Sequence, residues 1–433
     1  MKATVMTVMR MMTTMMLVAM PIPVRYFGEG REKPRVKIFR DQAAWCPYCQ
    51  KVWLMLEEKR VDYETVKVPM RSYGDKPQSF LKLIPNGLLP AMEIDGRLMT
   101  ESLDIMVTIE RTFPDPDKPM IPPAGPLLDR AQQLLGLERK LFGAWCGYMF
   151  RPEVPFLGGG DGEFTSVLEQ VDRELGSNTE SPFFLPYAWP TLVDMQYVSH
   201  VERAVASAMF YKGYDVRKRF PNIDSWLSAY EALPHYMATK SDYYTHCMDI
   251  PRGTHSDIDS DLAREARSAI EPGSARASAP LDSELEPLTA QQRAAPEEHF
   301  RVEAAWSLVQ NHEAVARFCC RAAGSGVGDW ASGNPTKCRL ADPYATPAEE
   351  MLPSVEAALR SVAAALLRGD PAVARAAREA AEAEVGAPPG GWPLAAACLE
   401  YLRDRVGSPR DLSMPAAKLL RGYLNEAVAS LRA

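Results

Sequence analysis

A pair of cysteines between a predicted strand and a predicted helix constrains the fold of this 433-residue chain most strongly. Residues 36–40 alternate between apolar and polar side chains, a pattern that indicates a β-strand. The sequence Cys46-Pro47-Tyr48-Cys49 follows, and residues 52–60 have the amphipathic pattern of a helix. Pro47 suits the first turn of such a helix, where its missing N–H group costs nothing. Cys46 then lies at a helix amino terminus, where unpaired N–H groups and the helix dipole favour a thiolate.

The second cysteine, Cys49, extends the chemistry that the motif can perform. It lies one helical turn after Cys46, so it can donate a hydrogen bond to the thiolate or close a disulfide with it. A lone Cys-x-x-Cys can also be half of a metal site. However, none of the six histidines pairs with the eight cysteines at the spacing of a structural zinc site, so we expect no metal. Eight cysteines in 433 residues are too few for a disulfide scaffold and favour a reducing compartment.

The elements expected after this helix complete the order βαβαββα. The sequence predicts a strand at residues 63–68, a short helix at 79–83 and a hairpin at 89–100 with an Asp-Gly turn. A further helix begins after Ser102, which we expect to be its cap. This order is that of an α/β thioredoxin-like domain, which we place at residues 36–117.

The motifs of this domain resemble those of the glutathione transferase superfamily. The resemblance is to its cysteine-dependent branch, the omega, lambda, dehydroascorbate reductase and iota classes. The matching sequences are Cys46-Pro47-Tyr48-Cys49, Lys76-Pro77, Pro85-Asn86-Gly87-Leu88-Leu89-Pro90 and Glu101-Ser102. The resemblance implies a cis peptide bond before Pro90 and a backbone pairing of Leu89 with the cysteinyl part of glutathione. Cys46 would be the catalytic residue, with Cys49 as its second thiol.

The same resemblance implies that three polar residues bind the two ends of glutathione. Lys76 would neutralise the glycine carboxylate, while Glu101 and Ser102 would hold the γ-glutamyl end. These roles suit the side chains, because a helix amino terminus and a lysine attract carboxylates and a glutamate attracts an ammonium. Two structural alternatives stand beside them: Glu101-Ser102 as an N-cap with its flank, and Lys76 as a solvated loop charge.

Cys49 departs from the omega and lambda pattern, which has a small residue without a thiol at that place. The second thiol makes the motif resemble glutaredoxins and iota-type transferases instead. The sequence therefore leaves a monothiol and a dithiol mechanism both open.

An all-helical transferase domain is expected at residues 126–250. Apolar residues recur at steps of three and four from Leu127 to Phe142, which predicts a long amphipathic helix. Thr191 and Asp194 form a capping box before a strongly apolar helix, and we expect its role to be structural. The aromatic residues that follow Phe142 have two interpretations, core packing or the acceptor-substrate pocket that the resemblance implies there.

The remaining sequence predicts a linker and a second helical region. Residues 251–296 are rich in Ser, Ala, Asp, Glu and Pro, which indicates a largely disordered linker with one transient helix near Leu262. Residues 297–433 have helical periodicity and predict an all-α bundle of four to six helices with no catalytic constellation. The bundle is of unknown role, and iota-like transferases resemble this chain in having a long extension.

The amino-terminal segment, residues 1–35, has the composition of a leader. It has no acidic residue before Glu29, and eight of its first twenty residues are methionine. We expect a transit peptide for a plastid or mitochondrion, with a disordered tail on a cytoplasmic protein as the alternative. Its apolar run is too short and too broken for a transmembrane helix, so no membrane partner is expected. The net charge of -7 gives no basic footprint for nucleic acid.

These observations favour an enzyme, a glutathione-dependent thioltransferase or reductase. Its Cys46 thiolate would form a mixed disulfide, with glutathione as co-substrate and a small oxidised or glutathionylated molecule as substrate. Two alternatives remain: a non-catalytic ligand-binding or docking protein, and conventional conjugation of glutathione to electrophiles. The resemblance also implies a homodimer.

Overall fold

The computed structural model describes ten stretches of the chain, and the structural statements below concern these residues: 24–28, 30, 32–70, 75–150, 161–250, 258–270, 277–278, 280–282, 288–325 and 345–433. They form two compact units, which we call the sheet unit (residues 24–294 with 324–346) and the bundle (295–323 with 347–433). The expected organelle address rests mainly on residues 1–23, which lie outside the described residues.

The sheet unit begins with a five-stranded sheet in the order β1-β3-β2-β4-β5. Strands β2 and β3 run parallel, with Val36 opposite Tyr63, and the other neighbours are antiparallel. The strands are β1 (Val24–Arg25), β2 (Val36–Asp41), β3 (Tyr63–Val68), β4 (Ala91–Ile94) and β5 (Arg97–Met99).

The short strand β1 lies inside the segment that the sequence assigned to a leader ending at residue 35. Its residues pair with Tyr63 and Glu64 of β3, and the Arg25 guanidinium binds the buried Glu57 carboxylate at 3.1 Å. Two residues have no readable period, so the sequence pattern contained no signal for this strand. The folded part of the chain therefore starts earlier than expected.

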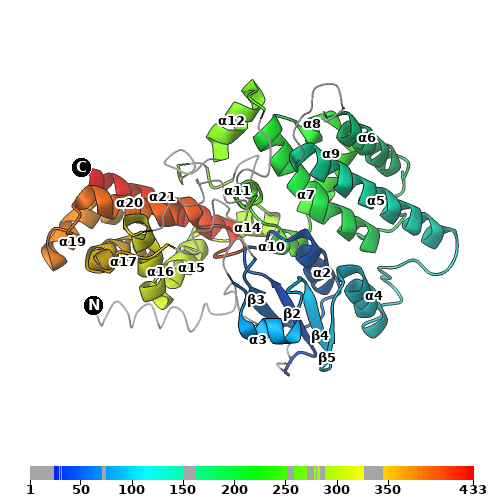
Figure 1. The fold of residues 1–433 in the computed structure, drawn as a ribbon, viewed down its shortest axis with the longest axis horizontal. Helices are drawn as coiled ribbons and strands as arrows, with labels where there is room; N and C mark the ends of the chain where they lie inside the picture. The colour runs from blue at the N-terminus through cyan, green and yellow to red at the C-terminus, as the bar shows by residue number, and fades with distance from the viewer. Residues whose placement is uncertain are drawn as a thin grey trace. The chain divides into compact units, whose positions relative to one another are not determined.

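Helices cover both faces of the sheet, because β2 has apolar side chains on both sides. Val36 and Ile38 belong to a core shared with α2 (Pro47–Glu58) and α4 (Ser102–Thr112). On the opposite face Phe39 packs against Phe80 of α3 (Gln78–Leu83), with ring centroids 5.8 Å apart. Figure 1 shows α3 on one side of the strands and α2 with α4 on the other. The predicted βαβαββα order is confirmed, with β1 as an added edge strand.

The nine remaining helices described in this unit follow the sheet. They are α5 (Pro126–Phe150), α6 (Gly162–Gly176), α7 (Leu192–Lys212), α8 (Val216–Arg219), α9 (Pro221–Glu231), α10 (Pro234–Thr239), α11 (Tyr243–Met248), α12 (Asp261–Ile270) and α14 (Ala290–Ala294).

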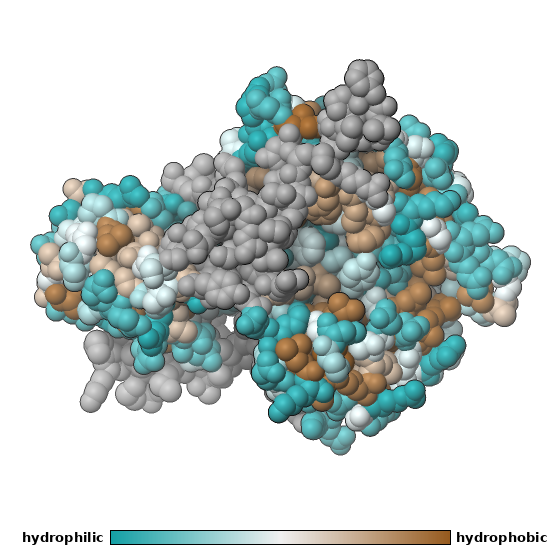
Figure 2. Space-filling view, viewed as in Figure 1, coloured by the Kyte–Doolittle hydropathy of each residue, from teal (hydrophilic) through white to brown (hydrophobic). Residues whose placement is uncertain are grey.

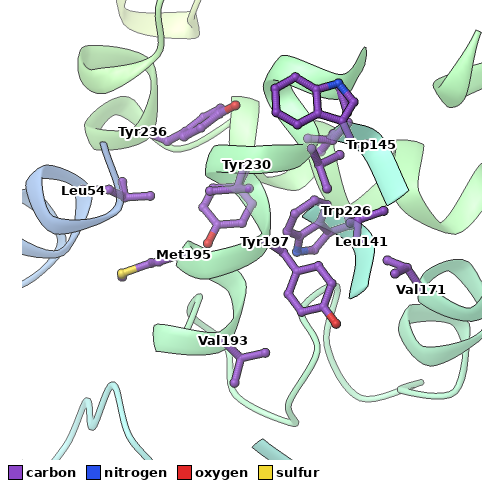
Figure 3. Close-up of a cluster of buried hydrophobic side chains, with 14 of the residues drawn as sticks. Leu54, Leu141, Trp145, Val171, Val193, Met195, Tyr197, Trp226, Tyr230 and Tyr236 are labelled. Carbon is purple, nitrogen blue, oxygen red and sulfur yellow. The ribbon is translucent and has the colours of Figure 1, made fainter. Parts of the chain in front are cut away.

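Helix α7 forms the centre of this unit, and the predicted capping box starts it. The Thr191 N–H group and hydroxyl both donate to Asp194 Oδ2 at 2.9 Å. In Figure 3 the Met195 side chain lies on the side of Leu54 of α2, and the Tyr197 side chain lies beside Trp226 of α9. This helix therefore joins the core of the sheet to the core of the helices.

The aromatic side chains late in α5 are part of this core. Trp145 and Tyr148 are only 2% and 5% exposed, and the Trp145 indole N–H donates to Ser207 Oγ at 3.0 Å. Of the two interpretations that the sequence allowed, core packing is the one the structure supports for these residues.

Part of the expected linker is folded against α7. Ala263 and Ala266 of α12 are buried, and the Ile258 N–H group donates to the Tyr211 carbonyl at 2.8 Å. Gly213 ends α7 with a φ of +64°, and a Cβ at that position would lie 2.2 Å from Ser260 Oγ. The helix expected to be transient near Leu262 is thus packed against α7. The chain before this helix comes so close to Gly213 that a side chain there would clash.

The bundle contains seven α-helices and two 3-10 turns among its described residues, more helices than the predicted four to six. The alanine-rich stretch from Ala372 to Val385 is divided between two helices, because the backbone of Ala376 leaves the helical conformation at ψ 9°. The helices are α15 (Glu297–Gln310), α16 (His312–Cys320), α17 (Leu352–Arg368), α18 (Pro371–Arg375), α19 (Ala377–Val385), α20 (Trp392–Arg405) and α21 (Met414–Arg432), with turns η2 (Arg321–Ala323) and η4 (Glu349–Met351).

Small and aliphatic side chains make up the bundle core, which includes the fully buried Cys319 and Cys320. Within the part of the chain that the structure describes, no helix combines the length and the apolar character needed to cross a bilayer.

Candidate active site

Cys46 lies at the amino terminus of α2, as the sequence predicted. It is the N-cap residue, in an extended conformation at φ -60° and ψ 116°, and Pro47 occupies the first turn. The loop before it folds around Asp41, whose Oδ2 accepts the Trp45 N–H at 2.7 Å and the Cys46 N–H at 3.2 Å. The carboxylate at the end of β2 therefore fixes the backbone on which the cysteine stands.

Asp41 was not among the site residues predicted from the sequence. In the structure its side chain is only 1% exposed. Its only sequence signal is a charged residue at the end of an apolar strand, five positions before Cys46. Its Oδ1 has no hydrogen-bond partner among the described residues. A carboxylate oxygen of Asp41 and the Sγ atoms of Cys46 and Cys49 all lie within 4.8 Å of one another.

Cys49 is 1% exposed and lies behind Cys46, which is 6% exposed. Burial raises the pKa of the Cys49 thiol well above its ordinary value, and the hydrogen bond to Cys46 and the charges of Cys46 and Asp41 raise it further. The Cys49 thiol is therefore the proton donor of the pair, in agreement with the expected hydrogen bond to the Cys46 sulfur.

Lys76 lies between the cysteines and the loop before β4. Its Nζ donates to the Pro69 carbonyl at 2.8 Å, and its side-chain carbons would contact a Cβ at Gly87, where φ is +67°. Burial lowers the pKa of Lys76, and the charges of Cys49, Cys46 and Asp41 oppose that shift. The ammonium is thus within electrostatic reach of the cysteine pair, half-buried rather than freely solvated.

The Leu89-Pro90 peptide bond is cis, which is the geometry that the family resemblance implied. Pro90 is buried, and Leu89 is half-buried against the core between the sheet and α3. Leu88 is 59% exposed, and Figure 2 shows hydrophobic side chains among hydrophilic ones over this part of the sheet unit.

The structure corrects the expectation that Ser102 caps α4. Glu101 is the N-cap residue, at the left-handed φ of +62°, and Ser102 is the first helical residue. The Glu101 side chain is exposed and makes no capping hydrogen bond. An L-residue in this conformation stores backbone strain. The surrounding structure therefore imposes this conformation on Glu101 at the helix start, where the resemblance assigns it a role in binding the ligand.

A buried polar network behind the active-site loop was not predicted from sequence. Arg203 of α7 is fully buried and its Nε donates to the carbonyl of Trp45. Its Nη1 donates to Gln50 Oε1 at 2.6 Å, and its Nη2 reaches the carbonyl of Ala44 at 3.5 Å. Ala44 has a φ of +57°, so this guanidinium holds a strained turn two residues before Cys46.

Glu202 and His246 extend this network. Gln50 Nε2 and the Tyr236 hydroxyl donate to Glu202 Oε2 at 2.8 and 2.9 Å, and His246 Nε2 contacts Glu202 Oε1. Burial alone would raise the pKa of Glu202, but His246, Arg203 and Lys240 together lower it to about 2. The carboxylate is therefore ionised and balances the buried guanidinium. The only sequence signal was the presence of charged residues on an otherwise apolar helix.

A second buried cluster lies beside Tyr48. His200 Nδ1 and Glu138 Oε1 are 2.5 Å apart, and the Tyr48 and His200 rings meet edge to face at 5.6 Å. Lys51 Nζ lies 4.9 Å from the centre of the Tyr48 ring and donates to Gln196 Oε1 at 2.5 Å. Burial lowers the pKa of Lys51 to about 8. Polar residues of α7 thus contact the active-site helix at Tyr48, Gln50 and Lys51.

Comparison with known proteins finds one described family that is similar to the part of the chain that carries this site. Residues 45–112 match the family described as the N-terminal domain of glutathione S-transferases. Glutathione S-transferase DHAR2 of Arabidopsis thaliana is 24% identical over 196 residues, which are 45% of this chain and 84% of that protein. Glutathione S-transferase L3 of the same plant is 27% identical over 201 residues, covering 46% and 79%.

Among solved structures, the dehydroascorbate reductase of Chlamydomonas reinhardtii covers 50% of this chain and 96% of its own, with 19% identity and a TM-score of 0.40. The residues that match the family, 45–112, contain the predicted motif positions from Cys46 to Ser102.

Proposed function

We propose that this chain, a member of the glutathione transferase superfamily, is a glutathione-dependent thioltransferase or reductase whose nucleophile is Cys46. The observation that carries the proposal is the position of Cys46 at the N-cap of α2, in a glutathione S-transferase N-terminal domain. A helix amino terminus stabilises a thiolate, and the thiolate is the attacking species in disulfide exchange. The similarity to proteins named as glutathione S-transferases supports glutathione as the co-substrate.

The proposed reaction has two exchange steps. In the first, the Cys46 thiolate attacks the glutathione sulfur of a glutathionylated substrate, a Cys46–glutathione disulfide forms and the substrate leaves as a thiolate. In the second, a glutathione thiolate attacks that disulfide, oxidised glutathione leaves and the Cys46 thiolate returns. In sum, the substrate is released as a thiol, one free glutathione is oxidised, and the oxidised glutathione contains that molecule together with the glutathionyl group of the substrate.

Cys49 offers an alternative second step. Its sulfur could attack the Cys46–glutathione disulfide, release glutathione and leave a Cys46–Cys49 disulfide that two further glutathione molecules reduce. The 4.8 Å limit on the donor atoms places the two sulfurs close enough for this exchange after a small movement.

We propose that glutathione binds along the loop before β4 and the start of α4. Leu89 and Pro90 would receive its cysteinyl backbone, Lys76 its glycine carboxylate, and Glu101 with Ser102 its γ-glutamyl end. The cis Leu89-Pro90 bond, the half-buried ammonium and the exposed strained glutamate support these roles. A homodimer, which the family resemblance implied, is likewise a proposal.

The test is reduction of a glutathionylated peptide by the full-length protein. Cys46→Ser should lose at least about 100-fold in kcat/KM, because it removes the nucleophile. Cys146→Ser is the matched control, since Cys146 is a partly exposed thiol on α5, and it should keep wild-type activity. If the Cys49→Ser variant keeps most of its activity, the thiol that resolves the mixed disulfide belongs to glutathione. If the variant stops after one turnover, the resolving thiol is that of Cys49.

Three results would contradict the proposal. Undiminished reduction by Cys46→Ser would remove the assigned nucleophile. A wild-type protein that binds glutathione but reduces no disulfide would be a ligand-binding module, and one that conjugates glutathione to electrophiles without Cys46 would be a conventional transferase.

A further inference from the structure

We propose that Asp41, Cys46 and Cys49, when the cysteines are reduced, form a three-residue binding site for one Zn²⁺ ion. The site would be a second property of the same pocket, distinct from disulfide exchange. The ion would occupy both sulfurs, so zinc binding and disulfide formation would exclude each other.

The spacing of the three groups fits a tetrahedral ion. Their donor atoms lie within 4.8 Å of one another. In a tetrahedral site with Zn–S bonds of about 2.3 Å and Zn–O bonds of about 2.1 Å, the ligand atoms lie about 3.5–3.8 Å apart. Contraction by about 1 Å would therefore bring all three groups into coordination. Cys46 is the N-cap of α2, Cys49 lies in its first turn, and Asp41 is the last residue of β2. Rotation of these side chains can therefore provide the contraction.

The second oxygen of Asp41 points independently to a ligand. Asp41 is 1% exposed, and its Oδ2 is engaged by two backbone N–H groups. Its Oδ1 is buried without a hydrogen-bond partner among the described residues. A buried carboxylate oxygen without a partner is costly, and a cation removes that cost. The backbone contacts also orient the carboxylate, as the outer contacts of metal ligands do.

The charges also balance. Two thiolates and one carboxylate carry three negative charges, and Zn²⁺ reduces the sum to one. The Lys76 ammonium, whose electrostatic partners are Cys49, Cys46 and Asp41, offsets the remainder. A buried group of charges that sums to about zero avoids most of the desolvation penalty.

The donor set selects the metal. Two thiolates with one carboxylate favour Zn²⁺ over Mg²⁺ or Ca²⁺, which prefer oxygen ligands. Three protein ligands leave a fourth position for water or for the thiolate of glutathione. Both sulfurs bind the ion as thiolates, so the proton of the Cys49 thiol leaves to solvent, and no oxidation state changes.

Cobalt substitution tests the proposal on the reduced full-length protein. Co²⁺ should bind at one equivalent per chain with a thiolate-to-metal charge-transfer band and the visible bands of a tetrahedral ion, and Zn²⁺ should remove both. Asp41→Asn keeps the shape of the side chain but loses its charge, and it should weaken binding at least about 10-fold. Cys146→Ser should bind as the wild type does.

Oxidation provides a test without any substitution, which covers the case in which Asp41→Asn fails to fold. Wild-type protein with a Cys46–Cys49 disulfide should lose the charge-transfer band, and a thiol reductant should restore it. An equal band in the oxidised protein, or in Cys46→Ser/Cys49→Ser, would show that the ion binds elsewhere and would overturn the proposal. These readouts do not depend on catalysis, so the zinc site and the proposed reductase activity can fail separately.

Discussion

At the scale of single residues, Arg203 connects the helices to the chemistry of the sheet. Its guanidinium contacts the carbonyls of Ala44 and Trp45 and the amide oxygen of Gln50, all from the turn and helix that carry Cys46. Because Ala44 is strained at φ +57°, the turn needs an external contact to keep its shape. Arg203 is therefore a positioning residue for Cys46 and not a group that touches the substrate.

We predict that Arg203→Met lowers kcat/KM for the glutathionylated peptide by about 10- to 100-fold, since small displacements of a nucleophile are costly. Free methylguanidinium should restore part of the activity, an effect that a merely destabilised protein would not show. Arg217→Met is the matched control, because Arg217 pairs with Asp224 and Glu231 away from the active-site loop. Equal losses in both variants would contradict a positioning role.

His200 and His246 make the sheet unit sensitive to acid. Burial lowers the pKa of both side chains, although Glu138 raises the pKa of His200 and Glu202 raises that of His246, so both histidines are neutral in the folded protein at neutral pH. In the unfolded chain they titrate near their ordinary value of about 6.5. Below that pH the unfolded state binds more protons than the folded state, so acid reduces stability.

We predict that the free energy of unfolding falls as pH drops from about 6.5 to 5, by up to about 1.4 kcal/mol per pH unit for each histidine. Denaturant unfolding across this range measures the slope. His200→Gln/His246→Gln should flatten it, whereas His312→Gln, at a side chain that is 62% exposed, should leave it unchanged. A slope that persists in the double variant would assign the acid sensitivity to other groups.

At the scale of secondary structure elements, the capping box organises the junction around α7. Asp194 is fully buried and accepts hydrogen bonds from Thr191, Phe184 N–H and Trp226 Nε1. One carboxylate thus fixes the start of α7, the preceding loop and α9.

We predict that Asp194→Ala destabilises the sheet unit by at least about 2 kcal/mol, because it leaves several buried donors without an acceptor. Asp215→Ala, at the exposed N-cap of α8, should cost about 1 kcal/mol or less. Urea denaturation of both variants measures the difference. Equal losses of unfolding free energy in the two variants would mean that Asp194 stabilises the protein no more than an ordinary N-cap residue does.

The elements show which parts of this fold a sequence can predict. Helix α2 and its N-cap cysteine were predictable because a Pro at the first turn, an apolar period and a preceding strand agree locally. The cap of α4 was not predictable: Glu101 takes the place expected for Ser102, at a left-handed φ that a glutamate rarely adopts. The Arg203 network was not predictable, since its partners lie more than 150 positions away in sequence.

At the scale of the whole molecule, the hydrophobic clusters of the described residues divide between the two units. The clusters of the sheet unit draw on residues 36–250, and the cluster of the bundle draws on residues 304–431. Units with independent cores can unfold independently. The candidate active site belongs entirely to the sheet unit.

We predict two unfolding transitions when the full-length protein is heated in a calorimeter. Asp194→Ala should shift only one of them, because Asp194 belongs to the sheet unit. Glu303→Ala should shift only the other, since Glu303 accepts hydrogen bonds from Ser413 within the bundle. A single transition that both variants shift would show that the two units unfold as one.

The most direct test of the central claim is to identify the cysteine that forms the mixed disulfide. The reduced protein is mixed with oxidised glutathione, quenched with acid and examined by peptide mass spectrometry. The proposed function predicts that the first adduct forms on Cys46, ahead of Cys146 and the buried cysteines of the bundle. A glutathione adduct on another cysteine while Cys46 remains reduced would contradict it.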